Sequence, residues 1–155
     1  MTDQHSLDLL NQLHPKVRQS AIDAYNEAVQ ATPKGVHPSI TQTYRSFEES
    51  DKIYQQGRTT PGGIVSNAKA GQSWHNWSLA LDFVLLANGN QSWKVDNNWM
   101  VVVSVFKKHG WAWGGDWKSF KDFPHLEKQC GQTLKGLMEL KKNGKFIPGT
   151  NFIDF

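Results

Sequence analysis

The residues best suited to chemistry lie between Ser73 and Asp82, where a histidine and an aspartate occur seven positions apart in a largely apolar segment. His75 and Asp82 are both common metal ligands, and a zinc ion with bonds near 2 Å holds its ligands only ~3 Å apart. Seven residues span about 10 Å in a helix and about 23 Å in a strand. The chain must therefore fold back between His75 and Asp82 if both are to bind one ion.

The segment from Leu79 to Leu86 predicts a strand that follows this turn. Both sets of alternating positions are apolar apart from Asp82, which is typical of a strand buried on both faces, and residues 76–78 supply the turn before it. A buried carboxylate is costly unless it is paired or metal-bound. Taken alone, the segment leaves two interpretations open: a metal site, or an Asp82 paired with an arginine while His75 lies in a surface loop.

A second group of candidate residues follows in the Gly-Trp-x-Trp-Gly-Gly-Asp-Trp run that begins at Gly110, and in the sequence Asp122-Phe123-Pro124-His125. His125 adds a third candidate ligand and Asp122 adds a candidate base. The tryptophans of the run fit equally well in a core or in the wall of a substrate groove.

Together these motifs resemble the zinc peptidases of the D-alanyl-D-alanine carboxypeptidase and L-alanyl-D-glutamate endopeptidase family, which includes phage endolysins. The similarity extends from about residue 40 to about residue 127 and follows the family's order of motifs. It implies a zinc ion as cofactor and Asp122 as the catalytic base. The zinc ligands implied by position are His75, Asp82 and His125.

The resemblance also implies roles for Arg45 and Ser73. An arginine at this strand-to-helix junction holds the substrate or its developing oxyanion in the family, and a guanidinium can do so with two hydrogen bonds. The alternative for Arg45 is an ordinary salt bridge. Ser73 corresponds to the serine that contacts the substrate backbone. The family's glycine position is Ser78 here, and a positive φ at a serine costs about 1 kcal/mol.

The function implied is zinc-dependent hydrolysis of the stem peptide of bacterial peptidoglycan, at the L-alanyl-D-glutamate bond. Arg58-Thr59 and the tryptophan run favour this endopeptidase activity over the alternative, a D-alanyl-D-alanine carboxypeptidase. A non-enzymatic alternative is a zinc-containing binding module. Structural zinc sites are closed by four protein ligands, and His109 is the candidate fourth ligand in that case.

Length and composition indicate one domain. The chain has 155 residues and a single cysteine, Cys130, so its folding does not require a disulfide. We expect an α+β fold in which a small antiparallel sheet carries the zinc site and is flanked by helices. We also expect a monomer, with a peptidase core at residues 37–127 and a C-terminal helix and tail at residues 128–155.

The net charge of +3 is unevenly distributed, because lysines outnumber acids between Lys107 and Lys145. No nucleic-acid motif accompanies them, so we expect no nucleic-acid partner. A solvated surface and attraction to an anionic wall polymer both remain open. We find no membrane span and no signal peptide, and predict an enzyme that stays in the cytoplasm until release and acts on the cell wall.

Periodicity and capping signals predict the remaining elements. Residues 58–71 form a patternless loop that leads into Ser73, so we expect it to border the cleft. Asn88-Gly89-Asn90 predicts a turn after the central strand. The predicted helices span residues 6–13 with Ser6 as N-cap, 15–31, 47–56 with a Ser46/Glu49 capping box, 99–106 and 128–142, and the predicted strands span 40–44, 79–86 and 111–113. Three consecutive valines leave a strand open as the alternative for residues 99–106.

Overall fold

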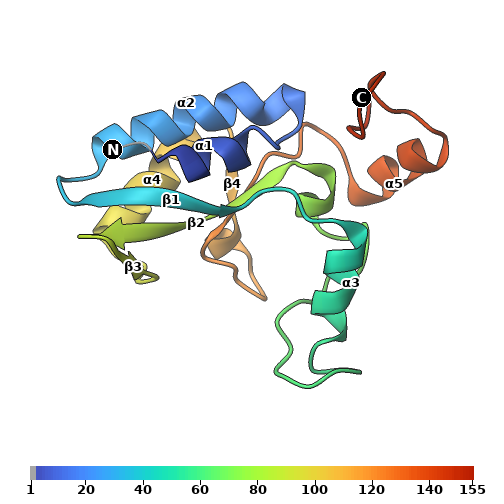
Figure 1. Cartoon of the computed structure of the whole chain (residues 1–155), viewed down its shortest axis with the longest axis horizontal. Helices are drawn as coiled ribbons and strands as arrows, with labels where there is room; N and C mark the ends of the chain where they lie inside the picture. The colour runs from blue at the N-terminus through green and yellow to red at the C-terminus, as the bar shows by residue number, and fades with distance from the viewer. Residues whose placement is uncertain (1–2) are drawn as a thin grey trace.

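The computed structural model describes residues 3–155, which form an antiparallel sheet with helices packed along one side of it and two helices further away (Figure 1). The strand order is β1-β2-β5-β4, and β3 pairs with β2 at its far end. The fold is α+β with a small antiparallel sheet, as the sequence predicts. The strands are β1 (Val36–Gln42), β2 (Ala80–Ala87), β3 (Asn90–Ser92), β4 (Ala112–Trp113) and β5 (His125–Glu127).

The helices divide into two groups. Helices α1 and α2 pack along β1, and α4 packs beside α2. Helices α3 and α5 lie beyond the C-terminal end of β1, away from this layer (Figure 1). The helices are α1 (Gln4–Leu10), α2 (Pro15–Ala31), α3 (Phe47–Gln55), α4 (Asn97–Lys108) and α5 (Leu134–Lys142), with the 3₁₀ turns η1 (Trp74–Trp77) and η2 (Gly114–Asp116).

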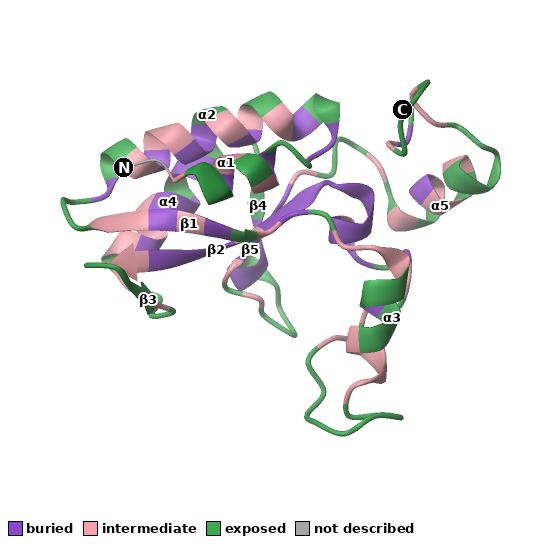
Figure 2. Cartoon of the chain, in the orientation of Figure 1, coloured by how far each residue is buried: buried purple, intermediate pink, exposed green. Residues whose placement is uncertain are grey.

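Strand β2 is the centre of the core, and most of its length is buried (Figure 2). Its apolar side chains pack against both helical and strand neighbours, and Phe83 contacts Trp99 with their ring centroids 4.4 Å apart. A strand covered on both faces reads as a continuous apolar run. This burial holds Asp82, the one charged residue of the strand, in a fixed position.

Several predicted element boundaries are confirmed. Helix α2 begins with Pro15 at its first position and ends at Ala31. The capping box of Ser46 and Glu49 begins α3, and Asn88 and Gly89 turn the chain between β2 and β3 with positive φ angles.

Other boundaries were wrong, and the structure gives a reason for three of them. The N-cap of α1 is Asp3 and not Ser6, whose hydroxyl lies inside the helix and accepts the N–H of Ile40. Strand β1 ends at Gln42, because its register with β2 shifts after Ile40. Helix α5 begins only at Leu134, because Cys130 and Gly131 adopt positive φ angles that interrupt a helix.

The C-terminal tail docks on the body of the protein. The buried His14 ring donates from Nε2 to the carbonyl of Ile153 at 2.7 Å and stacks on Phe155. Ile153 itself belongs to the core. Within residues 3–155, no helix is both long and apolar enough to cross a membrane.

Candidate metal centre

The turn η1 brings His75 back toward β2, as the spacing of His75 and Asp82 requires. Ser73 caps the turn, because its hydroxyl accepts the N–H of His75 at 3.2 Å. Ser78 then reverses the chain in the left-handed region at φ 57°. The residue at the family's glycine position therefore does adopt the strained conformation that a glycine would accept freely.

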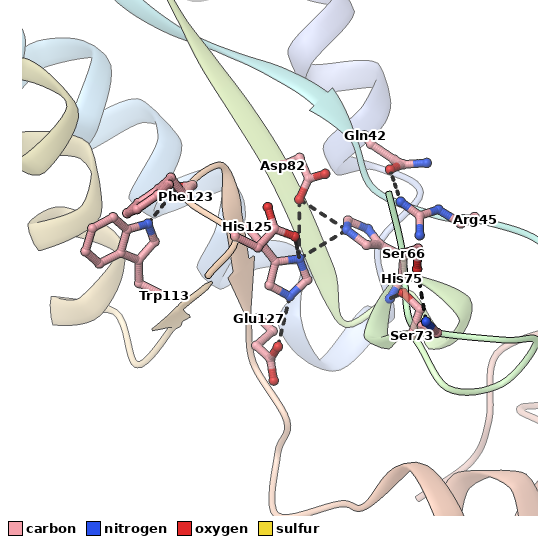
Figure 3. A network of polar contacts seen from close by, with 12 residues as sticks. Gln42, Arg45, Ser66, Ser73, His75, Asp82, Trp113, Phe123, His125 and Glu127 are labelled. Atoms are coloured by element: carbon pink, nitrogen blue, oxygen red, sulfur yellow. Dashed lines mark hydrogen bonds and ion pairs between the residues drawn. The ribbon is translucent and has the colours of Figure 1, made fainter. Parts of the chain in front are cut away.

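Donor atoms of three residues converge on one point (Figure 3). His75 Nε2 lies 3.2 Å from Asp82 Oδ1 and 3.2 Å from His125 Nδ1, and His125 Nδ1 lies 3.3 Å from Asp82 Oδ1. Bonds of about 2.0–2.1 Å in a tetrahedral zinc site separate ligand atoms by about 3.3 Å. The spacing of this cluster therefore fits one ion of that size.

The outward-facing nitrogens of both histidines are occupied, which selects their tautomers. His75 Nδ1 donates to the carbonyl of Thr43 at 2.7 Å, and His125 Nε2 donates to Glu127 Oε1 at 2.9 Å. Each histidine thus turns a bare nitrogen toward the shared point. Such outer partners orient metal ligands and raise their basicity.

Glu127 was missed by the sequence reasoning. It is 2 % exposed, and its second carboxylate oxygen accepts from the Gln129 amide. The available signal was its position two residues after His125 in a short strand, which puts both side chains on one face.

Hydrogen bonds within the cluster shift the pKa values of Asp82 and His125 in the direction opposite to the effect of burial. Burial alone would raise the pKa of Asp82, but hydrogen bonds with His125 and His75 hold it well below its usual range. Burial likewise lowers the pKa of His125, but hydrogen bonds to Asp82 and Glu127 outweigh this and raise it to about 9. The cluster therefore favours positive charge at its centre, whether a proton or a metal cation supplies it.

The alternative of an Asp82–arginine pair with His75 at the surface is wrong. His75 is 2 % exposed, and the ion-pair partners of Asp82 in residues 3–155 are the two histidines. His109 also does not complete a fourth position, because it bonds to Glu27 at 3.1 Å. Among the described residues, the cluster has three candidate ligands.

Asp122 lies at the edge of this cluster. Its Oδ2 is 3.9 Å from His125 Nδ1, and its side chain is 44 % exposed toward the cleft. Burial and the nearby charge of Asp82 raise the pKa of the Asp122 carboxyl. A carboxylate with a raised pKa beside a candidate metal point is suited to take up and return a proton.

Arg45 and Ser73 line the same cleft. Arg45 donates to Gln42 Oε1 at 2.6 Å (Figure 3), and its buried Nε has no hydrogen-bond partner. No ion pair in residues 3–155 includes Arg45, so the salt-bridge alternative finds no carboxylate. Its charge and its free donors remain available to a ligand.

The cleft has a volume of about 1110 Å³. Its walls come from the 65–72 part of the long loop, η1, the 117–122 segment and α5. The loop thus borders the site as predicted. Trp117 lies on this wall, with its ring 5.1 Å from that of His125, whereas Trp111 is buried in the core.

An open His-Asp-His cluster in a cleft beside a carboxylate and an arginine is the arrangement of a metal-dependent hydrolase. Residues 66–128 match the protein family described as D-alanyl-D-alanine carboxypeptidase. The chain is 48% identical over 126 residues to the peptidoglycan L-alanyl-D-glutamate endopeptidase CwlK of Bacillus subtilis, covering 74% of this chain and 72% of CwlK. The chain therefore belongs to peptidase family M15.

A second relative is the L-alanyl-D-glutamate peptidase of Listeria phage A118. It is 30% identical over 95 residues, which are 60% of this chain and 31% of the phage protein.

Solved structures agree on the fold. The L-Ala D-Glu endopeptidase ChiX of Serratia marcescens superposes with a TM-score of 0.60 at 20% identity, covering 82% of this chain and 88% of ChiX. The vancomycin resistance D,D-pentapeptidase VanY from a VanB-type cassette, solved in complex with Zn(II), superposes with a TM-score of 0.52 at 15% identity, covering 85% of this chain and 79% of VanY.

Proposed function

We propose that this chain is a zinc-dependent peptidase that hydrolyses the L-alanyl-D-glutamate bond in the stem peptide of bacterial peptidoglycan. The observation that carries the proposal is the convergence of His75, Asp82 and His125 in an open cleft, in a chain 48% identical to an endopeptidase of that specificity. The carboxypeptidase alternative rests on the more distant likeness to VanY, at 15% identity.

We assign the zinc ligands to His75 Nε2, Asp82 Oδ1 and His125 Nδ1. Two imidazoles and one carboxylate are the donor types that zinc prefers, and three protein ligands leave a position open. When bound, zinc in such a site supplies a Lewis acid that activates water and polarises a carbonyl. The bonds to Thr43 and Glu127 keep both histidines in the tautomer that this role needs.

Three further residues carry the chemistry in our assignment. Asp122 takes up the proton of the attacking water and returns it to the leaving amine, for which its raised pKa is suited. Arg45 stabilises the developing oxyanion or a nearby substrate carboxylate. Ser73, which lines the cleft, contacts the substrate backbone.

We also propose that residues 1–155 form one peptidase domain. A single hydrophobic cluster includes residues from α1, β2, α4, α5 and the tail, so residues 128–155 belong to the same core as the site.

Digestion of purified peptidoglycan tests the substrate assignment. We expect new D-glutamate amino termini, identified by mass spectrometry of the released fragments. Release of free D-alanine without such termini would support the carboxypeptidase instead. Retention of zinc without any cleavage would support the binding module.

A further inference from the structure

The lysines between Lys107 and Lys145 do not share one role. Lys107 pairs with Asp116 at 2.6 Å, Lys108 pairs with Glu27, and Lys128 bonds to the carbonyl of His109 at 2.8 Å. The bonds of these three lysines link α2, α4 and the residues that follow α4. A different set of lysines lies on the wall of the cleft.

Helix α5 stands apart from the sheet (Figure 1), and one of its faces forms a wall of the cleft. Leu137 anchors the helix in the core, and Met138 packs so closely on Gly71 that a Cβ there would lie 2.2 Å from the Met138 methyl group. The helix is therefore fixed against the loop that leads into η1. The face that it turns to the cleft consists of Leu134, Lys135, Met138, Glu139 and Lys142.

Lys135 and Lys142 are exposed, and neither has a hydrogen bond or ion pair among residues 3–155. The third lysine on the cleft wall, Lys121, already donates to the carbonyl of Gly115 at 2.9 Å. Seven residues of helix separate Lys135 from Lys142 by about 10 Å, so two free ammonium groups lie along one wall.

The substrate of the proposed reaction carries the complementary charge. Glutamate has two carboxyl groups and only one continues the peptide, so the D-glutamyl residue keeps a free carboxylate next to the bond that is cut. The metal point and both lysines line one cleft, so a stem peptide bound across it can present this anion to the α5 wall. A charged hydrogen bond is stronger than a neutral one, and a lysine supplies a flexible point charge for it.

We propose that Lys135 and Lys142 form a recognition site for the free carboxylate of the D-glutamyl residue, which makes the enzyme selective for acidic over amidated stem peptides. This inference rests on the proposed function and adds a specificity determinant to it. Glu139 lies between the two lysines on the same face of α5. Its carboxylate opposes an anionic ligand and limits the affinity of the site.

Two synthetic stem peptides test the site, one with D-glutamate and one with D-isoglutamine at the same position. In the wild-type protein we expect a KM for the D-glutamate peptide roughly 5- to 20-fold lower than for the amidated one. In Lys135→Gln/Lys142→Gln this preference should disappear, through a rise in KM for the acidic peptide. Glutamine removes the charge and keeps a polar side chain of similar helix propensity.

Two controls accompany the double variant. Glu139→Gln should have the opposite sign and lower the KM for the acidic peptide. Lys94→Gln, at an exposed lysine outside the cleft, should keep the wild-type preference. Circular dichroism of each variant checks that α5 is folded.

The outcomes separate this inference from the proposed function. Cleavage of both peptides with one KM, or a preference that survives in the double variant, would overturn the lysine site and leave the endopeptidase assignment intact. A wild-type protein that cleaves neither peptide would overturn the endopeptidase assignment, and the carboxylate site would fall with it.

Discussion

Two regions of this protein bury histidines, and they do so for different purposes. At the start of α2, both ring nitrogens of His14 bond to backbone groups, the N–H of Lys16 and the carbonyl of Ile153. At the cleft, His75 and His125 each bond outward through one nitrogen and turn the other to a point shared with Asp82. Burial alone therefore does not mark a functional histidine. A functional histidine is marked instead by a ring nitrogen that has no backbone partner and points to the same place as the donor atoms of other residues.

The comparison predicts its largest effect for the ligands themselves. We expect His75→Ala and His125→Ala to lose stoichiometric zinc and to lose hydrolysis by more than the ~10–100-fold that follows loss of an outer partner of a ligand. His14→Asn should retain zinc, because its ring lies outside the cluster. Metal analysis of the purified proteins, together with peptide hydrolysis, provides the measurement. Loss of zinc in His14→Asn alone would reverse the distinction.

Asp122 separates chemistry from metal binding within the cleft. Asp122→Asn preserves the shape of the side chain and removes its capacity to take up a proton, so we expect hydrolysis to fall ~10²- to 10⁴-fold. Zinc content should stay at the wild-type level, since Asp122 is outside the cluster of three donors. A variant that keeps both zinc and full activity would remove Asp122 from the role of base.

Substitution of Glu127 should have a smaller effect on zinc binding, because Glu127 acts only through its bond to His125. Glu127→Ala leaves the Nε2–H of His125 without its buried acceptor, and we expect zinc affinity to fall ~10- to 100-fold. Glu127→Gln retains an acceptor oxygen without the charge and should fall in between. Titration against a competing chelator measures the zinc affinity of each variant, with Glu48→Gln, at an exposed glutamate outside the cleft, as the control. Equal affinities in all four proteins would show that the bond does not orient the ligand.

The turn and the buried strand that hold His75 and Asp82 could be predicted because local rules determine them. A buried apolar strand that contains one aspartate and follows a turn with a histidine allows few arrangements. His125 was a candidate by its residue type, but its place beside His75 and Asp82 came from the resemblance, since nothing local links residue 125 to residue 75. That pairing depends on the contact of β5 with β2, whose register sets Asp82 opposite His125.

The outer parts were harder to predict because they depend on tertiary contacts. Glu127 had no motif of its own, and its role exists only through the bond to His125. Lys135 and Lys142 read as ordinary solvated residues of a basic segment, and only the docking of α5 through Leu137 and Met138 places them on the cleft wall. The burial of His14 likewise depends on a tertiary contact, because residues of the C-terminal tail cover its ring.

The smallest effect concerns His14 and the pH dependence of stability. Burial lowers the pKa of His14 from 6.5, and this effect outweighs the opposing hydrogen bond to the Ile153 carbonyl. Lys16 and Arg18 also lower the pKa, and Asp154 raises it. Well above pH 6.5 the ring is neutral in both the folded and the unfolded chain, so its titration has no effect on stability. Below this value the unfolded chain takes up a proton that the folded chain resists, and the free energy of unfolding therefore decreases.

His14→Asn should sharpen this contrast. Asparagine is a good N-cap, so α2 is retained, although loss of the bond to Ile153 and of the Phe155 contact should lower stability at pH 7.5 by ~1–2 kcal/mol. Between pH 7.5 and pH 5, denaturant unfolding should show a smaller loss of stability in the variant than in the wild type. His5→Asn, at an exposed position in α1, should keep the wild-type slope. The same slope in all three proteins would mean that protonation of His14 does not oppose docking of the tail.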